Sequence, residues 1–341
     1  MDFQLSDDQR ALRSGMRDLL GAVFDRDRMR AAVERGGGVD RDRGVDRGLW
    51  RELGAAGFFA LRLPEEAGGV GLGLPEAVLL FEEAGRALLP GPLVATHLAA
   101  GLVKGAAEGE AVVTVAEGGG RPVADLGGAD AVLVGGGAGA VAGERLEVLT
   151  GEALEAFVAG AVPVRSMDPL TPLHRVEGRS AGAGASEAYP GALRREGALL
   201  SAAEQLGSAA RTTEMAVQHA RSRQQFGSLI GSFQAVKHLC ADMLARTEPA
   251  RSAVYAAAVT GDPVEIAAAK LLADEAAVRN ARDCLQIHGG MGFTWEADVH
   301  LHLKRAWLRA ARWLTATEAE EVLAADLDPV RPLYSGSAAL G

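Results

Sequence analysis

The chain is poor in cysteine, in net positive charge and in long apolar runs, and each shortage excludes a class of protein. Among 341 residues, only Cys240 and Cys284 are cysteines. Both lie in helical patterns without the spacing of metal ligands, so we expect buried thiols and neither a disulfide nor a metal site. Lys and Arg number 35 against 45 Asp and Glu, giving a net charge of -10. This balance argues against a nucleic-acid surface.

No apolar run is long enough to cross a membrane. The first ten residues carry acidic side chains where a secretory signal has a positive region followed by an apolar core. We therefore expect a cytoplasmic protein that binds neither membrane nor nucleic acid. His300 and His302 fall on different faces of a helix and predict no metal site. We expect both to pack at the surface or at an interface.

Helical periodicity dominates the two ends of the chain. With 48% hydrophobic residues, a chain of this length forms two or three domains with a substantial core. From Leu199 to Val217, apolar residues recur in steps of four and three, which predicts a narrow stripe for close helix packing. The predicted helices, with turns at Asp262–Pro263 and Gly289–Gly292, cover residues 5–34, 47–104, 229–246, 250–260, 264–287 and 296–323.

Between the helical regions the pattern becomes that of strands and turns. Short apolar runs at Ala111–Val115, Ala131–Val134 and Arg145–Leu149 stand between glycine-rich breaks. Gly135–Gly139 lacks the third glycine of a dinucleotide-binding loop, so we interpret it as a hairpin turn. We place the domains at 1–108 (helical), 109–190 (β), 191–330 (helical bundle) and 331–341 (tail).

The most informative segments are Arg223–Gly227, Phe233–Gln234 and Gln286–Phe293. An arginine offers a planar cationic fork for a pyrophosphate, glutamine amides donate and accept hydrogen bonds, and Gly289–Gly290 lets a backbone approach a ligand closely. Taken singly, such residues are ordinary features of a helix surface or helix end. In this order and spacing, they resemble the flavin-adenine-dinucleotide (FAD) signature of the acyl-CoA dehydrogenase family. The likeness runs from Phe3 to about Thr315.

The resemblance implies a mainly α fold with an N-terminal helical domain, a shortened middle β domain and a C-terminal four-helix bundle. It also implies α,β-dehydrogenation of an acyl-CoA, with FAD as cofactor and an electron-transfer acceptor as partner. A carboxylate would take the α-proton while a hydride passes to the flavin. The nucleotide contacts implied are Arg223 and Phe226 at the pyrophosphate, Gln234 at the diphosphate or ribose, Gln286, His288, Gly289 and Gly290 at the adenosine end, and Thr315 at the adenosine.

Two parts of the family pattern are missing. The flavin-ring signature of the β domain has no good counterpart, and Val115–Gly120 occupies its place. One family position of the catalytic base, counted from Gln286, falls on Trp313, and the other, counted back from Arg223, falls on Gly197. The adjacent Glu196 is the fallback base, although one residue along a helix turns a side chain by about 100°.

Three hypotheses follow from these departures. The first is that the chain is the base-less subunit of a heterotetramer and pairs with a longer acyl-CoA dehydrogenase-like subunit. It would then resemble the α2β2 enzymes of actinobacterial steroid side-chain oxidation, which act on cholesterol-type CoA esters. The second is a self-sufficient homomeric acyl-CoA dehydrogenase that uses Glu196. The third is a flavin-free scaffold or acyl-CoA-binding protein with the same fold.

Overall fold

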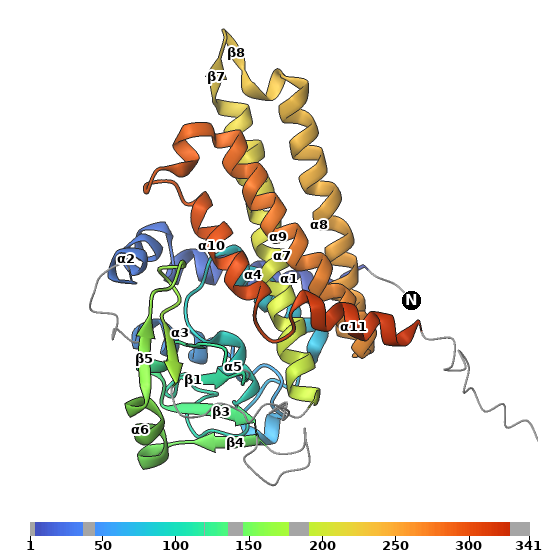
Figure 1. Cartoon of the computed structure of the whole chain (residues 1–341). Coiled ribbons are helices and arrows are strands. Elements are labelled where there is room, and N and C mark those ends of the chain that lie inside the picture. Colours follow the sequence, from blue (N-terminus) through green and yellow to red (C-terminus); the bar gives the residue numbers. More distant parts are fainter. Residues whose placement is uncertain (1–3, 37–44, 119, 136–145, 177–190, 328–341) are drawn as a thin grey trace, which may run out of the picture.

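The computed structural model describes residues 4–36, 45–118, 120–135, 146–176 and 191–327. Along the sequence, helices form the two ends of the described chain and short strands come between them. In space, the small sheets lie at the lower left of Figure 1, to one side of the helices. The N-terminal helices are α1 (Asp7–Val23), α2 (Arg26–Gly36), α3 (Arg47–Ala55), α4 (Leu74–Arg86) and α5 (Leu93–Leu98). Among the described helices, none combines the length and apolar character that a membrane crossing needs.

The N-terminal helices are shorter than the sequence pattern predicted. Ser6 starts α1 with a reciprocal cap, in which Ser6 and Gln9 each accept a hydrogen bond of 3.1 Å from the other's backbone N–H. The expected helix over 5–34 breaks before α2, where the Asp25 carboxylate accepts from Arg28 N at 2.8 Å. The expected helical region over 47–104 is divided into α3, α4 and α5. Leu88 and Gly91 take positive φ angles of 56° and 94° and separate α4 from α5.

The middle region contains two three-stranded sheets. β1 pairs in parallel with β3, which pairs antiparallel with β4, whereas β6 lies between β2 and β5 in a fully antiparallel sheet. The three predicted strands are present, but the sequence analysis missed the second sheet and a helix. Most of the predicted turn at Gly135–Gly139 lies outside the described residues. The elements are β1 (Val113–Ala116), β2 (Val123–Ala124), β3 (Ala131–Gly135), β4 (Leu146–Leu149), α6 (Gly151–Ala159), β5 (Ala161–Val164) and β6 (Leu173–Val176).

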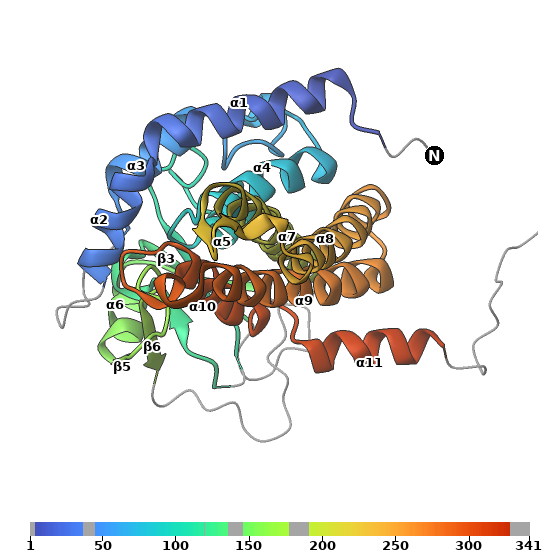
Figure 2. The same ribbon diagram turned by 90° about the horizontal axis from the view of Figure 1, so that it is seen from above.

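The C-terminal region is a bundle of long helices around a central one. Seen from above, the central helix α7 is surrounded by α4, α8, α9 and α10 (Figure 2). Its residues 197–209 are all buried, so the predicted narrow stripe is wrong: neighbours cover this part of α7 on every side. The elements are α7 (Gly191–Ser222), β7 (Gln224–Gln225), β8 (Ser228–Leu229), α8 (Gln234–Thr260), α9 (Pro263–His288), the 3-10 turn η4 (Gly289–Phe293), α10 (Val299–Ala310) and α11 (Ala316–Asp326).

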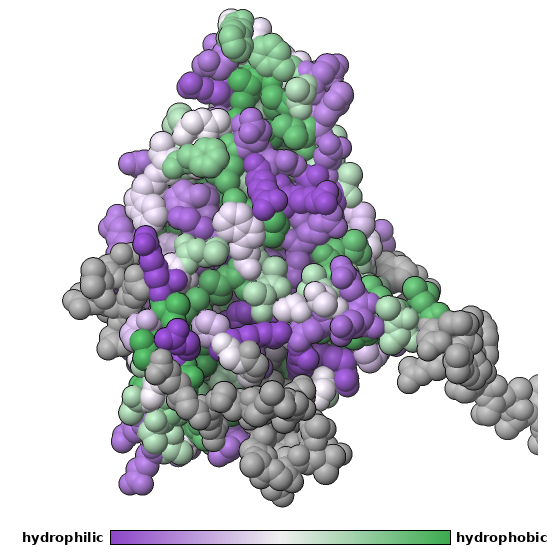
Figure 3. All heavy atoms as spheres, viewed as in Figure 1, coloured by the Kyte–Doolittle hydropathy of each residue, from purple (hydrophilic) through white to green (hydrophobic). Residues whose placement is uncertain are grey.

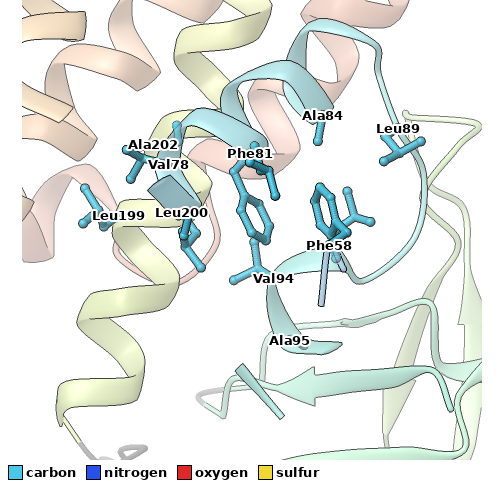
Figure 4. Packing of buried hydrophobic residues seen from close by; sticks show 14 of the residues in the cluster. Phe58, Val78, Phe81, Ala84, Leu89, Val94, Ala95, Leu199, Leu200 and Ala202 are labelled. Carbon is cyan, nitrogen blue, oxygen red and sulfur yellow. The ribbon is translucent and has the colours of Figure 1, made fainter. Parts of the chain in front are cut away.

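One hydrophobic core joins the N-terminal helices to the bundle. Figure 4 shows Phe81 of α4 between Leu200 of α7 and Phe58, with Val94 of α5 beneath. The Phe58 and Phe81 ring centroids lie 5.1 Å apart, a favourable separation for an aromatic pair. The two helical regions therefore form a single packing unit.

Two glycines bring α4 and α7 into backbone contact. A Cβ added to Gly85 of α4 would lie 2.5 Å from the Cα of Glu204, and one added to Gly207 of α7 would lie 2.8 Å from Arg86 N. Real Cβ atoms keep at least 3.0 Å from such neighbours. We call this pair the glycine notch, and it fixes the axial position of α7 against α4.

Two helix boundaries in the bundle also differ from expectation. α8 continues through Pro249, where a break was predicted, because its buried face runs on through Met243, Thr247, Ala250 and Val254. The expected helix over 296–323 is instead two helices, because Trp313 takes a φ of 63° between α10 and α11.

Buried polar groups tie the bundle together. The Asn280 amide of α9 donates to Met243 O at 3.0 Å and to Thr247 Oγ1 at 2.9 Å, and it accepts from Arg246 Nε at 2.9 Å. His302 is also buried, with its Nδ1 2.8 Å from Ser208 Oγ, and burial lowers its pKa to about 3. His300 is buried as well, so the expectation of surface or interface histidines is wrong.

Both cysteines are free thiols. Cys284 is buried, as predicted, whereas Cys240 is only half-buried. Burial raises the pKa of Cys284 to about 12, which leaves it protonated and unreactive at neutral pH. No group of side chains suited to a metal ion occurs in the described part of the chain.

Candidate nucleotide and substrate sites

The structure gathers most of the predicted nucleotide ligands at one end of the bundle. α7 and α9 end there and α8 begins there, because α8 runs antiparallel to both of its neighbours (Figure 1). We call this surface the nucleotide face. Its members are Arg223, Phe226, Gln234, Gln286, His288, Gly289 and Gly290.

A hairpin projects from the nucleotide face and carries Phe226 at its tip. β7 and β8 pair through Gln225 and Ser228, and the two loop residues, Phe226 and Gly227, have φ angles of 51° and 72°. Two left-handed residues make a type I′ turn, which is unusual for a phenylalanine. The Phe226 ring is 93% exposed and meets Phe233 edge to face. Figure 3 shows apolar side chains gathered at this end. A strained and exposed aromatic residue marks a contact surface.

The polar members of the nucleotide face are free to bind a ligand. Arg223, Gln234 and Gln286 are exposed, and within the described residues the Arg223 guanidinium has neither an ion pair nor a hydrogen bond. Gly289 combines a φ of 61° with a ψ of -143°, a conformation that only glycine adopts readily. This set supplies a bidentate cation, two amides and an approachable backbone, all open to solvent.

His219, which no sequence motif indicated, belongs to the same surface. Its ring stacks on that of His288, with centroids 4.1 Å apart and planes 17° apart. Arg223 N donates to His219 O at 2.9 Å, so the two residues stand one helical turn apart on the same face of α7. That spacing is the signal from which His219 could have been found.

Thr315 does not join this group. It caps α11: its hydroxyl accepts from Glu318 N and donates to Glu318 Oε2 at 2.8 Å. The adjacent turn is held at the start of α7, where Arg194 Nε donates to Trp313 O at 2.7 Å. At 1.5 Å per residue, about 45 Å of helix separates Arg194 from Arg223. Within one chain, Thr315 and Arg223 therefore cannot bind the same nucleotide.

The two family positions of the catalytic base lie side by side. Trp313 is only 3% exposed, and a Cβ added to Gly197 would lie 2.5 Å from Cδ2 and Cζ3 of its indole ring. The ring therefore occupies the space of any side chain at 197. Glu117, which follows β1, accepts from Trp313 N at 2.6 Å and from Arg312 Nε at 2.8 Å, and so fixes the ring in place.

The fallback base, Glu196, points elsewhere. Its carboxylate accepts from Arg62 Nη1 at 2.7 Å, and both side chains are about 30% exposed. The Glu196 carboxylate is therefore engaged by an arginine, whereas a general base must lie within hydrogen-bond reach of the proton that it takes.

A small polar cavity of about 40 Å³ lies next to Trp313, where all three regions of the chain meet. Arg305, paired with Asp168, and Arg309, paired with Glu204, each keep one guanidinium nitrogen without a partner among the described residues. Burial raises the pKa of Asp125 to about 7. The remaining lining residues are Gly91–Ala95, Thr171, Ser201, Leu308 and Arg312. Drug-sized ligands need roughly 300 Å³ or more, so no acyl thioester fits here.

Comparison with known proteins identifies the fold and the family. Residues 6–108 match the N-terminal domain model of acyl-CoA dehydrogenases, and residues 194–318 match the C-terminal domain model. Acyl-CoA dehydrogenase IpdE2 of Mycobacterium tuberculosis is 37% identical over 269 residues, which cover 78% of this chain and 82% of the relative. The chain belongs to the acyl-CoA dehydrogenase family.

Other relatives and solved structures agree with this assignment. IpdE2 of Mycolicibacterium smegmatis is 34% identical and covers 89% of this chain and 93% of its own length. The ChsE4-ChsE5 complex from Mycobacterium tuberculosis superposes with a TM-score of 0.75 at 23% identity, covering 97% of this chain and 100% of the solved one. The Tcur3481-Tcur3483 steroid acyl-CoA dehydrogenase gives a TM-score of 0.76 at 23% identity, with coverages of 94% and 97%.

These findings confirm the predicted family, its oxidoreductase class and the mainly α fold with a small β region. The predicted nucleotide ligands Arg223, Gln234 and Gln286 are exposed to solvent. At the predicted base positions, the indole ring of Trp313 fills the space beside Gly197.

Proposed function

We propose that this chain is a subunit of a heteromeric, FAD-dependent acyl-CoA dehydrogenase, and that it supplies nucleotide contacts but no catalytic base. The observation that carries the proposal is the Trp313 ring packed on Gly197. An indole has no basic atom to take an α-proton, and its ring excludes a carboxylate from position 197. The base must then come from another chain.

The other carboxylates near Trp313 support this proposal. Glu117 is committed to Trp313 N and Arg312, and Glu204 is paired with Arg309 at 2.8 Å. Asp125 has a pKa near 7, which suits a general base. However, Asp125 faces a cavity of about 40 Å³, which holds water-sized guests and no thioester. None of the three can reach a substrate in this arrangement.

The nucleotide face supplies the second argument, because it is a half-site. Arg223, Gln234 and Gln286 fit the phosphates and the sugar end of FAD, and Gly289–Gly290 fits its adenosine. When bound, the flavin would accept the hydride that leaves the β-carbon. All five residues are exposed, whereas a tightly held cofactor is largely enclosed. A longer partner chain docked over Phe226 would complete the enclosure and carry the flavin ring and the base.

For the substrate, we propose CoA esters with a steroid-type side chain. Support comes from the likeness to the Tcur3481-Tcur3483 steroid acyl-CoA dehydrogenase. The assembled complex should oxidise a steroid side-chain CoA at least tenfold more efficiently than a linear acyl-CoA, measured as kcat/KM. Equal efficiency with both would remove the steroid assignment and leave the subunit assignment intact.

The decisive experiment compares the chain alone with the chain purified together with its partner. The flavin absorbance and acyl-CoA oxidation with an artificial electron acceptor are measured on both preparations. The chain alone should be colourless and inactive, and the complex yellow and active. A yellow, active preparation of the chain alone would refute the proposal in favour of a homomeric enzyme, and a Glu196→Gln variant without activity would identify its base.

A pair of arginine variants tests the nucleotide face. Arg223→Ala should lower the flavin content of the complex at least tenfold, because it removes a charge-assisted pair of hydrogen bonds to phosphate. Arg221→Ala is the matched control, because Arg221 is an exposed arginine two residues earlier. Unchanged flavin content in Arg223→Ala would favour a flavin-free scaffold or acyl-CoA-binding protein.

A further inference from the structure

The stacked imidazoles of His219 and His288 lie beside Arg223 at the end of the bundle. His288 Nδ1 lies 2.8 Å from Cys284 O, so this nitrogen carries a proton and Nε2 remains for a ligand. No described residue hydrogen-bonds to the His219 ring. Both side chains are half-buried and therefore reachable from solvent.

The Arg223 guanidinium beside the pair has no acidic partner among the described residues. Burial lowers the pKa of His219, and the charges of His288 and Arg223 lower it further. From α9, Cys284 contacts His288, and from α8, Cys240 belongs to the same cluster. Neither thiol carries a charge at neutral pH, because burial raises the pKa of both. The His219 and His288 rings and the Arg223 guanidinium thus lie close together. No carboxylate is among the groups that shift the pKa of His219.

An anion is the missing counter-charge. A phosphate oxygen beside the stack would stabilise the imidazolium form of His219 and offset its repulsion from Arg223. Arg223 itself suits a pyrophosphate, since its planar fork binds two oxygens at once. Because the stacked imidazoles lie one helical turn from the Arg223 guanidinium, they would contact further oxygens of the same pyrophosphate.

We propose that His219 and His288 form a proton-coupled phosphate clamp that works with Arg223 to hold the pyrophosphate of a dinucleotide. This inference rests on the proposed function and adds a residue, His219, and a pH dependence to the nucleotide face. The sign follows from linkage. Binding of the anion raises the pKa of His219, so affinity is highest below the pKa of His219 in the free protein and is lost as pH rises through its pKa in the complex.

The first test follows the imidazole resonances of the full chain by NMR. The chain has seven histidines, so His219 and His288 can be assigned from single His→Phe variants. Inorganic pyrophosphate should raise the pKa of His219 by about one unit, which equals a tenfold preference of the anion for the protonated ring. His97, whose Nδ1 lies 3.2 Å from Phe58 O in the N-terminal region, serves as the internal reference and should not respond to pyrophosphate.

The second test uses flavin retention by the assembled complex. Retention should weaken about tenfold between pH 6 and pH 8 in the wild type. His219→Phe keeps a ring stacked on His288 but removes the proton, so it should abolish this pH dependence. Arg221→Ala, the control used for Arg223, should retain it.

The outcomes separate this inference from the proposed function. Unmoved imidazole pKa values, or a His219→Phe complex with the wild-type pH profile, would overturn the clamp. The proposed function would survive that result if Arg223→Ala still released the flavin. If Arg223→Ala had no effect either, both would fail.

Discussion

Filling the space at Gly197 should destabilise the fold only while Trp313 is present. Gly197→Ala places a methyl carbon 2.5 Å from two indole carbons, about 1 Å inside normal contact. The ring cannot retreat easily, since Glu117 and Arg194 hold the Trp313 backbone on both sides. Such overpacking costs about 1–3 kcal/mol. Without the ring, alanine should instead stabilise this helix position by up to about 1 kcal/mol.

A double-mutant cycle measures this coupling. Trp313→Ala alone should cost about 3–5 kcal/mol because it empties a buried site. Adding Gly197→Ala to that variant should then cost nothing or stabilise, so the coupling energy comes to about 1–4 kcal/mol. Free energies of unfolding from urea titrations, followed by both circular dichroism and fluorescence, give all four corners of the cycle. Gly15→Ala in α1 is the control, because nothing lies within 4 Å of its added Cβ. Additive effects would mean that Trp313 does not fill position 197, and the argument for a missing base would lose its main support.

Three further predictions follow from other residues. Asp125→Asn should raise the free energy of unfolding at pH 8 by a few kcal/mol and leave it unchanged below pH 4. The reason is that the wild-type stability falls as pH rises from about 4 through the folded pKa near 7. Parallel curves of unfolding free energy against pH for the two proteins would contradict the raised pKa. Asn280→Leu should lower the free energy of unfolding by about 2–4 kcal/mol in a denaturant titration, since it breaks a fully buried hydrogen-bond network between α8 and α9. A loss below about 1 kcal/mol would show that the network contributes little to stability. Phe226→Ser should change the stability of the chain by less than about 0.5 kcal/mol. It should weaken partner binding at least tenfold in a surface plasmon resonance assay. Unchanged binding would show that Phe226 is not part of the interface.

The sequence predicted those features that depend on local pattern and helix direction. Arg223, Gln234 and Gln286 are far apart in sequence, yet they meet because each lies at an end of one of three adjacent antiparallel helices. The type I′ turn at Phe226–Gly227 escaped prediction because phenylalanine seldom adopts a positive φ. His219 was missed because its significance depends on stacking with a residue of another helix.

Contacts between residues that are far apart in the sequence could not be predicted from it. Trp313 and Gly197 were each identified as empty base positions, but nothing in their spacing shows that one fills the space of the other. Buried charge pairs such as Arg305 with Asp168 read as surface residues in the sequence, since charged side chains are seldom buried unless paired. Helix ends at Phe24 and Trp313 depend on backbone conformations that tertiary contacts impose.

The glycine notch holds the middle of α7 against α4, so a displacement at this point moves both ends of the helix. Gly197 lies toward one end of this helix and Arg223 follows the other, with Gly207 between them against α4. Any side chain larger than hydrogen at 207 would push α7 along or away from α4 and displace both ends together. A substitution at Gly207 would therefore weaken flavin binding and loosen the packing of the Trp313 ring, although Gly207 contacts neither. Screens for inactive variants should recover substitutions at this position.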